Sequence, residues 1–269
     1  MSLDNLSALF MAVLAYSCIA GGETLMKMGI PWLGWRGPKN HAFFRSRRLW
    51  LLGLILANLY GIPSAIALRH LPAHVVGAFA GWTVVLLVFL SHRILGERLT
   101  RADILNALFF VAGIVTLSLQ ERPVAPVRIA TAILVGLCLL PIACTAGGFV
   151  KGFPNRVRAG LFSAAAGTSA GLMVIFLRLL VLRHGFALGG YLVSIHLYLY
   201  IFFALLSLAA LQLALKRGGM ILTAAMKYST AIITPFLGAV LVFSLPVNPL
   251  QWAAAALVVY SVIMLFQRR

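Results

Sequence analysis

Acidic residues are scarce in this sequence. Its 269 residues include only five Asp and Glu against 22 Lys and Arg, and charged residues make up 10% of the chain. A soluble domain of this length would carry about 25% charged residues. Hydrophobic residues make up 62% of the chain, and the mean hydropathy is +1.02. The shortage of charge therefore excludes an ordinary soluble domain and indicates that lipid is the solvent.

Several chemical signatures are also missing. The sequence has no GxxxxGK[ST] loop for a nucleotide phosphate and no His-Glu-x-x-His pattern or paired acids for metal or acid-base chemistry. The three cysteines, Cys18, Cys138 and Cys144, lie within apolar runs and have no metal-ligand spacing. We therefore expect no cofactor, no bound metal and no enzymatic activity, and any transport would not be driven by ATP within this chain.

Long apolar runs fill most of the chain. A membrane span needs about 20 predominantly apolar residues. Nine runs of roughly this kind can be marked, and each ends at charge, proline or glycine: 6–27, 49–68, 73–91, 104–120, 127–147, 159–182, 190–215, 220–243 and 250–267. The expected fold is an all-α, polytopic membrane helical bundle of about nine transmembrane helices.

The surplus of cations predicts orientation. A net charge of +17 would suggest nucleic acid in a soluble protein, but in a membrane protein Lys and Arg are retained in cytoplasmic loops. Counted on alternate sides of nine spans, fifteen cations lie on one side and five on the other, and two, Lys27 and Lys227, lie within spans. We expect an integral protein of the cell (inner) membrane, with the N-terminus outside, the C-terminus cytoplasmic and no nucleic-acid partner.

Two segments indicate an internal repeat. Ala67–Trp82 and Ala214–Tyr228 both place Ala-Leu and two basic or titratable residues at the end of one span, followed by a tight turn and a span of small residues. Spans one to four (1–120) therefore look like a distant copy of spans six to nine (157–269), with span five (121–156) as connector. An odd connector inverts the second copy, and inverted repeats are a transporter architecture.

The charged stretch from His92 to Ile104 predicts a turn between two spans. Gly96 can take the positive φ that ends a helix, and Thr100 can cap the next helix. Glu97 is spaced to pair with Arg93 or Arg101. We expect these charges to shape a cytoplasmic turn rather than to bind substrate.

These motifs also resemble a known family. The segment LGERLTRADILNALFFVAGIVTL is similar to the Gly-Glu turn and following helix of EamA-type members of the drug/metabolite transporter superfamily. The segment before it, the later LAALQLALKRGGMILTAAM and the number of spans look most like the NIPA-like branch. The resemblance covers Ala67–Leu117 in motif and implies a helical carrier with two repeats. Leu245-Pro246 stands where a second Gly-Glu turn would be expected.

Ionisable side chains within spans are expensive and therefore mark candidate functional sites. Glu23 and Lys27 share one helix face because they are four residues apart. Lys227 lies about 11 Å into its span at helical rise and is followed by Tyr228. Glu23 is the only carboxylate within any predicted span, so a Glu23–Lys227 pair is the economical hypothesis; the alternatives are an interfacial Glu23–Lys27 pair and a snorkelling Lys227.

Other side chains within the spans add polar or structural features. Trp82, Asn58 and Gln212 are further candidates for contact with a substrate, although such residues also bridge helices. Glycines and serines at four-residue spacing predict close helix packing, and prolines within spans predict bends: Gly77 and Gly81; Ser163, Gly167 and Gly171; Pro63, Pro141 and Pro235.

The sequence favours a secondary carrier that moves a small organic solute, anionic or lipid-like, by alternating access. The NIPA-like resemblance leaves a magnesium transporter as the alternative. Mg²⁺ is usually bound by carboxylates, and the positive charges of Lys27 and Lys227 disfavour a cation site. A membrane scaffold or enzyme is a further alternative. The expected partners are the solute and the bilayer, with the chain acting alone or as a homodimer.

Overall fold

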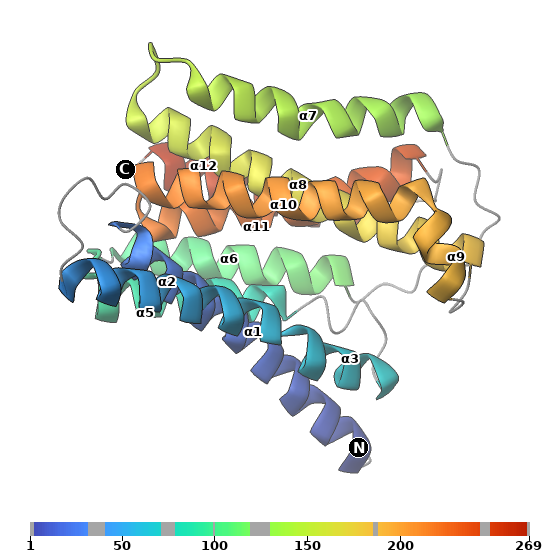
Figure 1. Ribbon diagram of the computed structural model, residues 1–269, viewed down its shortest axis with the longest axis horizontal. Coiled ribbons are helices and arrows are strands. Elements are labelled where there is room, and N and C mark those ends of the chain that lie inside the picture. Colours follow the sequence, from blue (N-terminus) through green and yellow to red (C-terminus); the bar gives the residue numbers. More distant parts are fainter. Residues whose placement is uncertain are drawn as a thin grey trace. The chain divides into compact units, whose positions relative to one another are not determined.

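The computed structural model describes residues 3–31, 41–70, 79–98, 100–118, 130–184, 188–242 and 248–267, and helices are the only regular elements in these ranges (Figure 1). The all-helical fold expected from the sequence is confirmed for this part of the chain. In chain order the helices are α1 (Leu3–Gly29), α2 (His41–Leu59), α3 (Gly61–His70), α5 (Ala80–Leu95), α6 (Arg101–Ser118), α7 (Thr131–Phe149), α8 (Asn155–His184), α9 (Leu188–Val193), α10 (Ile195–Arg217), α11 (Met220–Leu237), the π-helix η2 (Gly238–Val242) and α12 (Pro249–Gln267).

Several helices have the length and composition of membrane spans. Within the described ranges, five candidates stand out: Ser7–Gly29, Thr131–Phe149, Asn155–Phe176, Ile195–Arg217 and Met220–Val242. A shorter apolar helix covers Gly81–Leu95. These helices are those of an integral membrane protein, as the composition predicted. The count of nine spans and the inverted repeat stay predictions.

The helices form two compact units. The first comprises Met1–Glu121, Gly219–Ala224 and Pro249–Arg269, and the second comprises Arg122–Gly218 and Ala225–Asn248. Helix α12 thus belongs with the N-terminal helices, and α11 begins in the first unit and continues in the second. The predicted domain boundaries at residues 120 and 156 were drawn from repeated motifs rather than from packing, and they stay a prediction.

In the first unit, α1 packs closely along α2 because glycines remove side chains from the contact. A Cβ atom on Gly22 would lie 2.6 Å from the carbonyl oxygen of Gly53, and one on Gly53 would lie 2.6 Å from the amide nitrogen of Met26. Two turns beyond Gly22 on α1, a Cβ on Gly29 would lie 2.7 Å from the carbonyl oxygen of Ser46. The two backbones therefore approach along most of their shared length.

The other helices of the first unit form a chain of contacts that begins at α1. Helices α3 and α5 both lie against α1, α5 contacts α6, and α6 contacts α12. At the α5–α6 contact, a Cβ on the buried Gly81 would lie 3.3 Å from a methyl group of Val111. The predicted role of Gly81 in close packing is confirmed, whereas Gly77 lies outside the described residues.

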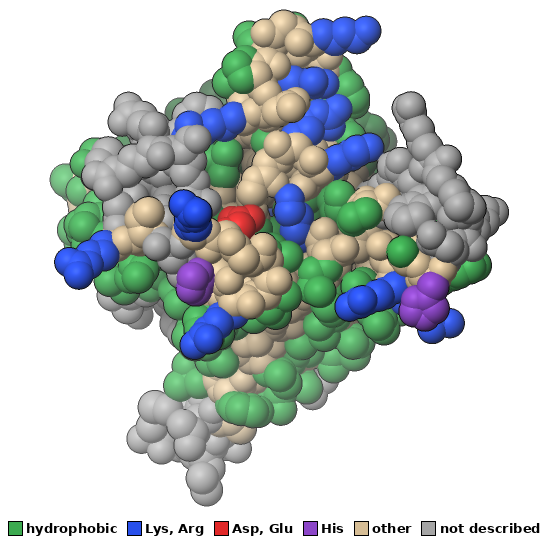
Figure 2. Space-filling model, turned by 90° about the vertical axis from the view of Figure 1, so that its left-hand side faces the viewer, with side chains coloured by type: hydrophobic (Ala, Val, Ile, Leu, Met, Phe, Trp, Pro, Cys, Tyr) green, Lys and Arg blue, Asp and Glu red, His purple; other side chains and the backbone are tan. Residues whose placement is uncertain are grey.

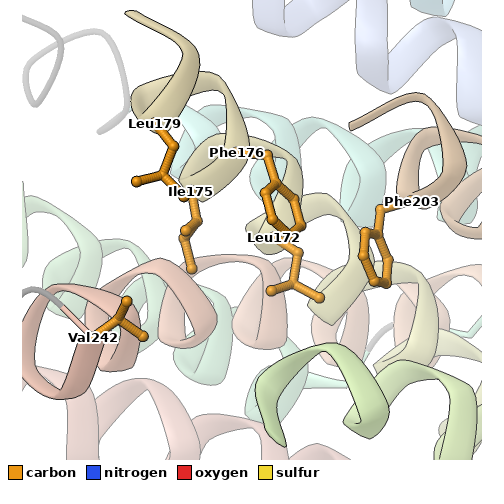
Figure 3. Close-up of a cluster of buried hydrophobic side chains, with 6 residues drawn as sticks. All are labelled: Leu172, Ile175, Phe176, Leu179, Phe203 and Val242. Atoms are coloured by element: carbon orange, nitrogen blue, oxygen red, sulfur yellow. The ribbon is translucent and has the colours of Figure 1, made fainter. Parts of the chain in front are cut away.

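In the second unit, α8 is the central helix and packs against α7 and α10 (Figure 1). The core is apolar, with Phe176 of α8 stacked on Phe203 of α10 at a centroid distance of 5.7 Å (Figure 3). Leu172, Ile175 and Leu179 of α8 and Val242 of η2 complete this buried cluster. The amide of Ala130 donates to the carbonyl oxygen of Val242 at 3.0 Å, which ties the start of α7 to η2.

The stripe Ser163–Gly167–Gly171 marks a close helix contact, as predicted. A Cβ on Gly167 would collide with the carbonyl oxygen of Lys227 and the hydroxyl of Thr230 on α11. One turn further, a Cβ on Gly171 would lie 2.6 Å from the Cβ of Thr234. Helices α8 and α11 therefore pack closely where α8 has glycines, and one of these contacts is at the backbone of the candidate residue Lys227.

Two of the three predicted proline bends coincide with a change in the helix. The second predicted span breaks at Tyr60, and Pro63 lies in the first turn of α3, where its missing N–H is tolerated. Pro235 lies near the end of α11, which passes into η2 at Gly238. Pro141 instead lies inside an uninterrupted α7, and its carbonyl oxygen accepts a hydrogen bond from the hydroxyl of Thr145.

Candidate functional site

Glu23 lies on α1 within the candidate span Ser7–Gly29 and is only 2% exposed. Six residues separate it from Gly29, which places it about 9 Å from that end of the helix. Lys27 lies one turn further and is half-buried. The first unit therefore carries a buried carboxylate one turn before a half-buried lysine in the last turn of α1.

Trp82 lies on α5 at the contact with α1. Its indole nitrogen donates to the hydroxyl oxygen of Ser17 at 3.0 Å, and the hydroxyl of the neighbouring Thr83 donates to the carbonyl oxygen of Tyr16 at 3.1 Å. The Trp82 side chain remains 39% exposed. Trp82 thus ties two helices together by its polar edge and keeps part of its ring accessible.

Lys227 and Tyr228 lie on α11 within the candidate span Met220–Val242. The Lys227 ammonium nitrogen lies 4.7 Å from the centroid of the Tyr228 ring, which is a cation–π distance. Tyr228 is buried and Lys227 is half-buried. Seven residues separate Lys227 from Met220, so its Cα lies about 10 Å along the helix from the first residue.

Asn58 and Gln212 occupy different environments. The exposed side-chain amide of Asn58 donates to the carbonyl oxygen of Leu54 on its own helix at 2.7 Å. Gln212 is buried on α10, in the second unit. Of the predicted residues, Glu23, Lys27, Asn58 and Trp82 belong to the first unit, whereas Gln212, Lys227 and Tyr228 belong to the second. The Glu23–Lys227 pair stays a prediction.

Two buried hydroxyl groups were not foreseen from the sequence. Most Ser and Thr side chains in these helices bond back to a carbonyl one turn earlier, as Ser163 does to Ala159 and Ser229 to Ala225. Within the described residues, the hydroxyls of Ser169 and Thr223 are buried and have no hydrogen-bond partner. Nothing in the local spacing distinguishes these two from their neighbours, because every one of them has a carbonyl within reach one turn earlier.

Glu97 has a role that spacing rules did not predict. Its carboxylate accepts hydrogen bonds from the amides of Met220 and Ile221, the latter at 3.2 Å. These are the first two residues of α11, so Glu97 caps a helix N-terminus 123 positions away along the chain. A Cβ on Gly219 would lie 3.3 Å from the same carboxylate. The pairs of Glu97 with Arg93 or Arg101 stay predictions.

The turn that presents Glu97 has the predicted geometry. Gly96 ends α5 in the left-handed region with φ 69°, and the amide of Glu97 donates to the carbonyl oxygen of Ser91 at 3.1 Å. Thr100 precedes α6, and its carbonyl oxygen accepts the amide of Ile104. The side chain of Asp103 lies outside the described part. The local motif therefore positions a carboxylate for a distant helix.

The distribution of charge is uneven. All five acidic residues lie in 1–121, so the ranges 122–218 and 225–248 of the second unit contain cations and no acid. Exposed Lys and Arg side chains are visible in Figure 2. Among the described residues, no group of three or more His, Cys, Asp or Glu could hold a metal ion, and the three cysteines are free and half-buried.

Comparisons with known proteins add no relative: no family model, no curated protein and no solved structure matches the chain.

Proposed function

We propose that the protein is a secondary transporter of the drug/metabolite transporter type, which moves a small organic solute across the membrane by alternating access. The proposal depends on one observation above others: Glu23 and Lys227 each lie well inside an apolar helix long enough to span a membrane. Ionisable groups at such depth are costly and are found where they serve a solute or ion path.

The charge balance around Lys227 supports an anionic or amphiphilic solute. The ranges 122–218 and 225–248 of the second unit, which include Lys227, contain cations and no Asp or Glu. The Tyr228 ring beside Lys227 offers an aromatic face, and Thr230 adds a hydroxyl one turn along. An organic anion with an apolar body would find both a countercharge and a surface for its body here.

The packing of α6 against α12 supports the inverted repeat. In the proposed repeat, these are the last helices of the two copies, 1–120 and 157–269, and they contact each other within the first unit. Copies related by a two-fold axis bring some equivalent helices together at the axis. In this proposal nine spans cross the membrane, and the cationic turns lie at the cytoplasmic face.

Magnesium is the alternative cargo, as the NIPA-like resemblance implies. The feature of the chain that favours magnesium is the buried carboxylate of Glu23, because Mg²⁺ prefers oxygen ligands. A cation carrier would gain nothing from Lys227, and its transport would survive removal of that lysine. A scaffold without transport activity would be insensitive to both residues.

The proposal is tested with purified protein in detergent and in proteoliposomes. Two ligand panels, divalent cations and organic anions, are first screened for binding, and transport of any solute that binds is then measured for Lys227→Ala, Lys227→Arg and Glu23→Gln. Lys216→Ala, at the exposed end of α10, is the matched control. We expect Lys227→Ala to reduce anion transport at least about tenfold, because one charge-assisted contact contributes about 1.5–3 kcal/mol, and Lys227→Arg to retain part of it.

Each outcome has a reading. Normal transport by both Lys227→Ala and Glu23→Gln would overturn the site. Binding of divalent cations alone, lost in Glu23→Gln, would favour the magnesium alternative. Binding of neither panel would favour a scaffold.

A further inference from the structure

Two arginines meet at one end of the second unit. Arg158 lies in the first turn of α8, and Arg217 is the last residue of α10. The Arg217 guanidinium lies 4.9 Å from the centroid of the Phe162 ring. Arg158 binds the carbonyl oxygen of Gly148, and a Cβ on Gly148 would lie 2.7 Å from that same ring, so both guanidiniums lie beside Phe162. The ranges 122–218 and 225–248 of this unit contain no Asp or Glu. Arg158 and Arg217 therefore place two positive charges close together at this end of the unit.

Neighbouring groups fix both guanidinium groups. The Arg158 Nε donates to the carbonyl oxygen of Gly148 at 2.9 Å, which satisfies a free carbonyl at the end of α7. Arg217 lies over the Phe162 ring, and within the described part of the chain its one hydrogen-bond contact is a long one of 3.4 Å with the carbonyl oxygen of Leu213. Each guanidinium has five N–H donors, so most of these donors remain available for a ligand.

The pair lies at the boundary of the candidate spans. Arg217 ends the span Ile195–Arg217, Arg158 lies in the first turn of the span Asn155–Phe176, and Gly148 is the penultimate residue of the span Thr131–Phe149. Three span ends therefore meet where the arginines lie. At this depth a bilayer presents phosphate groups rather than acyl chains or bulk water.

Exposed apolar side chains flank the arginines. Phe149 packs edge-on against Phe162 at a centroid distance of 5.1 Å and is itself 54% exposed. Val150 and Phe153, in the turn that follows, are 48% and 45% exposed. A ligand bound at the two guanidiniums would thus have an apolar surface beside its anionic group, which suits an amphiphile better than a free anion.

We infer that Arg158 and Arg217, with Phe149 and Phe162, form a binding site for the phosphate group of an anionic phospholipid. The guanidiniums would hold the phosphate by charge-assisted hydrogen bonds. The exposed Phe149 would contact the adjoining part of the lipid, and the buried Phe162 would hold the Arg217 guanidinium in position. The bound phosphate would also compensate the two positive charges. This site is independent of the proposed transport site at Lys227.

The test uses the full chain in a neutral detergent, with lipid binding followed by native mass spectrometry. The probes are dioleoyl phosphatidylglycerol, dioleoyl phosphatidylcholine and inorganic phosphate. We expect phosphatidylglycerol to bind at least about tenfold more tightly than phosphatidylcholine, because the zwitterionic head group compensates its own phosphate, and we expect Arg158→Gln/Arg217→Gln to remove this preference. The control Arg45→Gln/Arg47→Gln removes two exposed charges from the first unit and should retain the preference.

If the double variant is not monodisperse, the single variants Arg217→Gln and Arg217→Lys are used instead. Among the described residues, Arg217 makes only the long contact with Leu213, so its loss should disturb folding little. An unchanged preference in Arg217→Gln, or equal losses in the site and control variants, would overturn the site. Binding of inorganic phosphate as tight as that of phosphatidylglycerol, with the same dependence on Arg217, would overturn the assignment to lipid.

Discussion

At the scale of single residues, a few polar groups stand out against an apolar chain. Glu97 is the clearest case, because its turn was predictable and its partner was not. Gly96 is a local signal, and its predicted positive φ is confirmed, whereas capping by the Thr100 side chain stays a prediction. The bonds from Glu97 to Met220 and Ile221 join residues 123 and 124 positions apart, and no rule of local spacing reaches that far. Local spacing rules likewise cannot show whether Glu23 and Lys227 pair, so that pair stays a prediction.

Removing the Glu97 carboxylate should weaken the start of α11. We expect Glu97→Ala to lower the free energy of unfolding by about 1–2 kcal/mol, since it leaves two amides of the first turn without their acceptor. The measurement is unfolding in mixed micelles of a mild detergent and dodecyl sulfate. Arg101→Ala, an exposed position beyond the same turn, should change stability by less than about 0.5 kcal/mol. Equal effects of the two substitutions would contradict the capping role.

Gly96 offers a purely conformational test. Its φ of 69° is costly for any residue with a Cβ, yet nothing lies within 4 Å of the place that a Cβ would occupy. Gly96→Ala should therefore destabilise the protein by about 1 kcal/mol through backbone strain alone. The same unfolding measurement applies, and Gly136→Ala, in open space in the middle of α7, should be neutral or stabilising. A neutral Gly96→Ala would refute the left-handed turn.

At the scale of elements, hydrophobic run length predicted the positions of the helices well, because each run has to satisfy its backbone hydrogen bonds within itself. The breaks were harder to place. Pro63 indicated a bend in the second span, and the structure separates α2 from α3 three residues before it, at Tyr60. Nothing in the seventh run predicted the separate α9 and the interruption at Ser194, because Leu192, Val193 and Ile195 around it are as apolar as the helix that follows.

The glycine stripe on α8 makes a specific prediction about α11. Gly167→Ala would bring a Cβ against the carbonyl oxygen of Lys227, so α11 has to move away. We expect destabilisation by about 1–3 kcal/mol, as for other overpacked contacts, together with a loss of transport because Lys227 is displaced. Gly136→Ala is the matched control on a helix with free space. Wild-type stability and transport in Gly167→Ala would show that α8 and α11 do not meet at this glycine.

At the scale of the whole molecule, the central claim is a polytopic membrane protein with most of its loop cations, fifteen against five, on the cytoplasmic side. Composition alone predicted the membrane, and five described helices have the length and composition of spans. The contact between α12 and α6 was not predicted. The spacing of apolar residues along a helix does not indicate which distant helix it packs against. In the proposed arrangement, residues 47, 98, 151 and 216 lie on one side, and residues 189 and 248 lie on the other.

Cysteine accessibility in intact cells tests this claim most directly. In a chain whose three native cysteines are replaced by alanine, single cysteines are introduced by Arg47→Cys, Arg98→Cys, Lys151→Cys, Lys216→Cys, Gly189→Cys and Asn248→Cys, all at exposed positions. The account predicts that a membrane-impermeant maleimide labels the variants at 189 and 248 in intact cells and labels the other four only after the cells are opened. Labelling of the variants at 47, 98, 151 or 216 in intact cells would contradict it.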